Sequence, residues 1–119
     1  GLDWLVQAPE HLPWNGSPPD LDEMLGNLLD NAGKWARRQV VVQMQARGGG
    51  IELRIDDDGP GLPPAAREAA VQRGQRFDQQ AEGHGLGLTI VSDIADTYGG
   101  SLTLETARAG GLCAVLRLP

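Results

Sequence analysis

The stretch that decides the fold of this chain is Gly83-His84-Gly85-Leu86-Gly87-Leu88. Three glycines alternate with other residues and lead directly into an apolar pattern with helical spacing, which continues to Tyr98. A loop with little side-chain bulk therefore opens onto a helix N-terminus, where free backbone N–H groups and the helix dipole favour an anion. Such a glycine cluster can also be a flexible connector, so two further segments are needed to distinguish these interpretations.

The segment from Asp20 to Ala36 predicts an amphipathic helix. It follows two prolines, and Glu23 comes three residues after Asp20, as at many helix N-termini. One broad apolar face contains Leu21, Met24, Leu25, Leu28, Leu29, Ala32, Trp35 and Ala36. A narrow polar stripe borders that face and consists of Glu23, Asn27, Asn31 and Lys34. The stripe could line a pocket or be a solvated helix face, although asparagine is a poor residue within a helix.

The segment from residue 51 to residue 62 predicts a strand followed by a tight turn. Its residues alternate between apolar and polar up to Ile55, which is typical of a half-buried strand. The same period of two places Asp57 on the buried side, where a carboxylate must be hydrogen bonded. Gly59-Pro60-Gly61 follows and would bring the backbone close to whatever Asp57 faces. Alternatively, the strand ends at residue 56 and the three aspartates lie in water.

Together these segments resemble the nucleotide-binding domain of sensor histidine kinases, in the family shared with Hsp90, gyrase B and MutL. Residues 23–35 resemble the family's N box, Asp57-Asp58-Gly59-Pro60-Gly61 its first glycine box, and residues 83–88 its second. The order and spacing match over nearly the whole chain. Residues 25–32 together with Arg73-Gly74-Gln75-Arg76 are similar to PhoQ-like kinases.

Periodicity and turn residues predict the layout of the whole chain. Strands are expected over 2–7, 39–46, 51–57, 101–106 and 112–118, and helices over 20–36, 64–72 and 86–98. These elements predict an α+β two-layer sandwich, with one sheet covered by helices on a single face. The resemblance implies the same fold, the Bergerat ATP-binding fold, with a mixed, mostly antiparallel sheet and about three helices. It implies one domain over residues 1–119, with the loop from Arg73 to His84 acting as a lid.

The resemblance implies that this domain binds ATP and Mg²⁺, and it assigns roles at the adenine and metal ends. Asp57 would accept a hydrogen bond from the adenine amino group, and Gly59 and Gly61 would form the turn under the base. Trp35 would lie against adenine, or be a core aromatic residue. Asn27 would be the Mg²⁺ ligand, because a neutral oxygen suits a hard cation whose other ligands are waters and phosphates.

The remaining candidates would bind the phosphates. Asn31 would approach them, and Lys34 would supply positive charge. Gly85-Leu86-Gly87 would let the backbone come close to the triphosphate. Arg76 could reach the outer phosphates and His84 could contact Mg²⁺ or phosphate, or both could be solvated loop residues.

The sequence lacks a phosphoacceptor histidine on a helix, since His11 and His84 both lie in non-helical contexts. The resemblance therefore implies the catalytic domain of a sensor histidine kinase of a two-component system. It would donate the γ-phosphoryl group of ATP to a histidine on a separate dimerisation domain, upstream of a response regulator. The catalytic candidates are Glu23, Asn27 and Lys34, and the domain alone would be inactive as a kinase.

Glu23 leaves a second function open. It lies four residues before Asn27, where the chaperone and repair ATPases of the family keep their water-activating base. An ATP-hydrolysing conformational module is therefore the alternative, although the large coupling domains of those proteins are absent from this sequence. A protein-binding domain with a decayed pocket is the third possibility.

Composition excludes several other classes. The net charge of −6 and the sequence pI of about 4.7 argue against a nucleic-acid surface. Cys113 is the single cysteine, so no internal disulfide can form. No run of about 20 apolar residues and no signal peptide is present. We expect a monomeric cytoplasmic domain of a bacterial inner-membrane protein, with no direct membrane contact.

Overall fold

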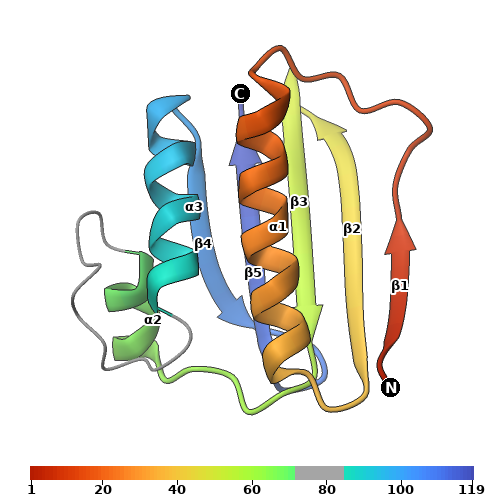
Figure 1. Cartoon of the computed structure of the whole chain (residues 1–119), viewed down its shortest axis with the longest axis vertical. Helices are drawn as coiled ribbons and strands as arrows, with labels where there is room; N and C mark the ends of the chain where they lie inside the picture. The colour runs from red at the N-terminus through yellow and green to blue at the C-terminus, as the bar shows by residue number, and fades with distance from the viewer. Residues whose placement is uncertain (72–84) are drawn as a thin grey trace.

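The computed structural model describes residues 1–71 and 85–119 and has two layers (Figure 1). The strands are β1 (Asp3–Gln7), β2 (Gln39–Arg47), β3 (Gly50–Asp57), β4 (Ser101–Thr106) and β5 (Leu112–Leu118), and the helices are α1 (Pro18–Trp35), α2 (Pro64–Val71) and α3 (Gly85–Thr97). The sheet order is β1-β2-β3-β5-β4, in which only the β1–β2 pair is parallel. The predicted α+β sandwich with a mixed, mostly antiparallel sheet is therefore confirmed.

The first helix begins at Pro18, two residues before the predicted start. Pro18 and Pro19 occupy its first turn, where a missing N–H costs nothing because it would have no partner within the helix. Asp20 is therefore not the N-cap. Its carboxylate instead accepts a hydrogen bond from the hydroxyl of Tyr98, which ties the start of α1 to the residue after α3.

The core lies between the sheet and the two long helices, α1 and α3, which pack side by side on one face (Figure 1). Residues spaced by three or four along each helix are buried, as expected for amphipathic helices. The fully buried side chains on the helices include Met24, Leu28, Leu88 and Val91, and those facing them from the sheet include Val40, Val42, Leu53, Ile55 and Leu116.

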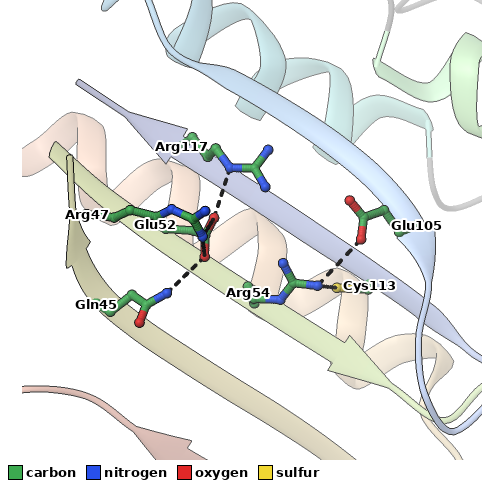
Figure 2. Close-up of polar contacts among 7 residues, drawn as sticks. All are labelled: Gln45, Arg47, Glu52, Arg54, Glu105, Cys113 and Arg117. Atoms are coloured by element: carbon green, nitrogen blue, oxygen red, sulfur yellow. Dashed lines mark hydrogen bonds and ion pairs between the residues drawn. The ribbon is translucent and has the colours of Figure 1, made fainter.

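Strand β3 is buried on both faces over most of its length, so the prediction of a half-buried strand is wrong for Glu52. Glu52 is 1% exposed because β3 lies in the interior of the sheet and long polar side chains cover the face opposite the helices. Its carboxylate accepts hydrogen bonds from Gln45 at 3.1 Å, from Arg47 at 3.2 Å and from Arg117 at 2.9 Å (Figure 2). Both oxygens of this buried carboxylate therefore accept hydrogen bonds from side chains of the neighbouring strands.

We predict that Glu52→Gln destabilises the fold by about 1.5–3 kcal/mol, the usual cost of losing a hydrogen bond to a charged group. Burial raises the pKa of Glu52, but the bonds from Arg117 and Gln45 and the charges of Arg47 and Arg117 outweigh it and lower the pKa from 4.5. A lowered pKa in the folded state contributes stability above about pH 4.5, which is lost as the pH falls through the folded pKa.

Thermal unfolding of the unmodified domain and of Glu52→Gln between pH 3 and pH 8 (roughly the range over which carboxylates titrate) would measure this contribution. The difference in stability between the two proteins should be largest near neutral pH and should become smaller in acid. Glu105→Gln is the matched control, because Glu105 is exposed and pairs with Arg54 at 3.4 Å, a geometry worth about 0–1 kcal/mol. Equal effects of the two substitutions would contradict a special role for Glu52.

Candidate functional site

The predicted site residues converge at one end of the molecule. Helix α1 ends there, β3 ends there and α3 begins there, at the lower end in Figure 1. The three motifs of the sequence are therefore adjacent in space, although about 60 residues separate the first from the last. The sheet supplies a carboxylate, α1 supplies amides and a cation, and α3 supplies its N-terminus.

Asp57 is buried, as the strand period predicts. It is 4% exposed and lies on the same side of β3 as Ile55, which is 2% exposed. Its Oδ1 accepts hydrogen bonds from the backbone N–H of Gly59 at 2.9 Å and of Leu112 at 3.2 Å. Because backbone N–H groups stabilise negative charge, the site holds a fixed, buried hydrogen-bond acceptor. The alternative of three solvated aspartates is wrong for Asp57.

The turn after Asp57 packs against the end of α1. A Cβ atom at Gly59 would lie 2.2 Å from the carbonyl oxygen of Trp35, so only glycine fits. Gly61 has φ +73°, a conformation that favours glycine. Gly111 is equally constrained, since a Cβ there would lie 2.4 Å from Asp57 Oδ1. The sequence marks Gly111 only as a turn residue, and its contact with the site arises from strand pairing.

Asp58 is a further site residue that the sequence analysis does not single out. Its carboxylate accepts hydrogen bonds from the backbone N–H groups of Arg37, at 2.7 Å, and Arg38, at 3.1 Å. The N–H groups of Arg38 and Arg37 hold the pKa of Asp58 below its usual value. These hydrogen bonds join the chain after Trp35 to the turn after Asp57. They therefore fix the positions of Trp35 and Asp57, the two predicted adenine contacts, relative to each other.

Asn27 faces the start of α3. Its Nδ2 donates to the carbonyl oxygen of Glu23 at 2.8 Å, which leaves Oδ1 to point the other way. A Cβ atom at Gly87 would lie 3.3 Å from that Oδ1, so a glycine at this position lets the two helices approach. The arrangement places an amide oxygen acceptor beside the first turn of α3.

The rest of the polar stripe runs from the interior to the surface. Asn31 is only 8% exposed, so the interpretation as a fully solvated helix face is wrong. Lys34 and Glu23 are exposed, and the Lys34 ammonium lies 5.8 Å from the centre of the Trp35 ring. Thr89, a polar residue within the apolar pattern of α3, is fully buried as well.

Part of the predicted site lies outside the described residues. Arg76, His84 and the expected lid from Arg73 to His84 belong to that segment. The backbone of Gly85-Leu86-Gly87 forms the start of α3. Within residues 1–71 and 85–119, no group of three or more His, Cys, Asp or Glu side chains could hold a metal ion.

Comparison with known proteins identifies the class to which this fold and site belong. The family described as histidine kinase-, DNA gyrase B- and HSP90-like ATPases matches residues 16–119. The chain therefore belongs to this family, as the three sequence boxes suggest. Within it, the similar proteins described below are sensor kinases.

The sensor protein kinase CarS of Pseudomonas aeruginosa is 48% identical over 118 residues, which cover 99% of this chain and 26% of that protein. The sensor protein PhoQ of Escherichia coli is 34% identical over 111 residues, covering 93% of this chain and 23% of that protein. The chain thus spans about a quarter of these relatives. In the part of the chain that the structure describes, no helix is long and apolar enough to cross a membrane.

Two solved structures extend the comparison to the fold. The mycobacterial sensor histidine kinase MprB superposes with a TM-score of 0.80 at 31% identity, covering 99% of this chain and 83% of that one. The ATP binding domain of PrrB from Mycobacterium tuberculosis gives a TM-score of 0.79 at 30% identity, with coverages of 99% and 80%. The similarity to sensor kinases is therefore one of structure as well as of sequence.

Proposed function

We propose that this domain binds Mg-ATP and donates the γ-phosphoryl group to a histidine on a separate dimerisation domain of a sensor kinase. The observation that carries the proposal is the buried Asp57 carboxylate, held by two backbone N–H groups beside a glycine turn. Such an acceptor pairs with the amino group of adenine and repels the carbonyl oxygen of guanine. Trp35, at the end of α1 against the same turn, would lie along the base, with Gly59 and Gly61 beneath it.

The phosphates would extend from the base toward the start of α3. Free N–H groups and the positive end of the helix dipole at Gly85-Leu86-Gly87 favour an anion there. Asn31 and Lys34 lie in the second half of α1, which ends at the same end of the molecule; Asn31 is a buried amide and Lys34 an exposed ammonium. Arg76 and His84 remain candidate phosphate contacts in this proposal.

Asn27 is the residue that would hold Mg²⁺. Its Oδ1 is directed toward Gly87, and its Nδ2 is already bonded to Glu23, so the oxygen is presented in a fixed direction. A single neutral oxygen fits a cation that keeps several waters and binds phosphate oxygens. When bound, the ion would neutralise phosphate charge during transfer.

The acceptor histidine would come from the dimerisation domain of the same kinase, and the phosphoryl group would pass from there to a response regulator. We place the domain on the cytoplasmic side of a membrane-anchored kinase, where ATP is available. Catalysis of phosphoryl transfer is mostly positioning and charge neutralisation. The residues of this chain would therefore bind and orient ATP, while the nucleophile arrives on the other domain.

We predict that the chain alone incorporates no label from γ-³²P-ATP, yet slowly labels its cognate dimerisation domain when the two are mixed. Transfer should be slow because separating the domains removes their high effective concentration. Gel autoradiography of each protein alone and of the mixture would test this. Label on His11 or His84 of the isolated chain would contradict the assignment of the acceptor.

A measurement of phosphate release distinguishes the alternative, an ATP-hydrolysing conformational module. That alternative is favoured by one observation, since Glu23 is exposed one helical turn before Asn27 and its backbone carbonyl orients that amide. We expect phosphate release by the lone domain to be slow and unaffected by Glu23→Gln. Asp22→Asn, at the neighbouring exposed acid, is the matched control. Rapid hydrolysis that is lost only in Glu23→Gln would favour the ATPase.

A further inference from the structure

A cavity of about 620 Å³ lies on the face of the sheet opposite the helices. Successive side chains of a strand point to opposite faces, so Asp56 lines this cavity while its neighbours Ile55 and Asp57 face the helical layer. Figure 2 looks onto this face, with Arg54 and Cys113 in front of the sheet and the helices behind it. Asp57 is also among the cavity's lining residues, so the cavity adjoins the proposed adenine site from the other face of the sheet.

Most carboxylate oxygens around this cavity already have partners within the described residues; the exception is the buried Oδ1 of Asp56, which accepts no hydrogen bond there. Both oxygens of Asp58 accept backbone N–H groups, and Glu105 pairs with Arg54 at 3.4 Å. The Cys113 thiol is hydrogen bonded to Asp56, and burial together with this bond raises the pKa of Cys113 to about 12, so the thiol stays protonated. The acceptors of the cavity are thus largely used within the protein.

Two basic side chains of the cavity form no ion pair among the described residues. Arg38 and Arg108 are exposed cavity residues, and neither forms an ion pair with another residue in the described ranges. Each guanidinium carries five N–H donors in a planar fork. The spare hydrogen-bonding capacity of the cavity is therefore cationic, on a chain whose formal net charge is −6.

We propose that this cavity binds a small organic anion through Arg38 and Arg108. Guanidinium groups bind carboxylate and phosphate with the same paired geometry, so either acidic group fits. Arg38 precedes β2 and Arg108 lies in the β4–β5 turn, and β3 lies between β2 and β5 in the sheet. The ligand class is therefore an anion with two acidic groups, reached from both sides. The cavity volume lies within the range of about 300–1,000 Å³ that is usual for small-molecule sites.

The cavity also shares backbone with the proposed adenine site, and this consequence rests on the proposed function. The turn that carries Arg108 leads into Leu112, whose N–H donates to Asp57, and the N–H of Arg38 donates to Asp58. An anion bridging the two arginines would hold the segment that donates to Asp57 and the segment that donates to its neighbour Asp58. Preorganising a site raises affinity, so the anion should tighten ATP binding, and ATP should tighten anion binding equally.

Titration of amide NMR shifts with succinate, and separately with inorganic phosphate, would test the site at constant ionic strength. We expect saturating shifts at Arg38 and Ala107, with succinate bound more tightly because it has two acidic groups. Arg38→Gln should weaken binding about tenfold, as expected for loss of a charged hydrogen bond. Arg37→Gln is the matched control, since it makes the same charge change at the preceding exposed residue, which does not line the cavity.

Saturation with either anion, with an affinity that is lowered about tenfold in Arg38→Gln and unchanged in Arg37→Gln, supports the site and identifies the acidic group. Amide shifts that rise linearly with anion concentration, or an affinity that falls equally in Arg38→Gln and Arg37→Gln, would overturn the proposed site. Calorimetry of ATP binding with and without succinate then tests the coupling, for which we expect about fivefold tighter binding. If the unmodified domain bound no ATP, the proposed function would be refuted. The anion titration would still test the cavity, because it does not depend on ATP.

Discussion

Replacing Asp57 with asparagine is expected to lower the affinity for ATP about ten- to a hundredfold while the fold is retained. The estimate follows from the loss of one hydrogen bond to a charged group, which is worth about 1.5–3 kcal/mol. The asparagine Oδ1 can still accept the N–H groups of Gly59 and Leu112, so the turn keeps its support. The loss should therefore appear in binding more than in stability.

Calorimetry with ATP and with GTP would measure this effect. The unmodified domain should bind ATP and have little affinity for GTP, because the carboxylate repels the carbonyl oxygen of guanine. Asp57→Asn should narrow that preference, since an amide can donate to a carbonyl oxygen. Asp30→Asn, at an exposed acid on α1, is the control for charge alone. Equal affinities for ATP and GTP in the unmodified domain would defeat the adenine assignment.

Local patterns predicted the parts of this structure that depend on neighbouring residues. The period of two correctly predicted that Asp57 lies on the buried side of β3. The glycine-rich turns predicted the ends of the hairpin strands to within a residue or two. The limits of β4 and β5 agree with the expected ranges 101–106 and 112–118. In each case a strand period or a turn residue acts over a few positions, so the sequence contains the whole signal.

The features that were missed depend on residues far apart in the chain. Glu52 is buried because Arg117 and Arg47 cover it from two neighbouring strands, which no local pattern can indicate. Asp58 resembles any turn aspartate until the end of α1 is placed against it. Gly111 resembles any hairpin glycine until β5 pairs with β3 and brings it against Asp57. The motifs predicted which residues form the candidate site, but the residues that support them could be found only from the fold.

Replacing Asn27 with alanine is expected to remove the Mg²⁺ dependence of ATP binding and to abolish phosphoryl transfer to the dimerisation domain. Asn27 presents the one amide oxygen that lies beside the first turn of α3 among the contacts described above. Alanine has no ligand atom but is a better helix former than asparagine, so α1 should be kept or slightly stabilised. A loss of function in this variant therefore cannot be attributed to unfolding of the helix.

Binding should be measured by calorimetry with Mg²⁺ and with EDTA, and transfer by labelling the dimerisation domain in trans. The unmodified domain should bind ATP more tightly with Mg²⁺, whereas Asn27→Ala should bind equally in both conditions. Asn27→Asp is the informative companion, because it keeps an oxygen ligand of the kind that Mg²⁺ prefers and should keep the metal dependence. If Asn27→Ala retained both metal dependence and transfer, the ion would have to be held elsewhere, and the directed Oδ1 of Asn27 would serve only to pack α1 against α3.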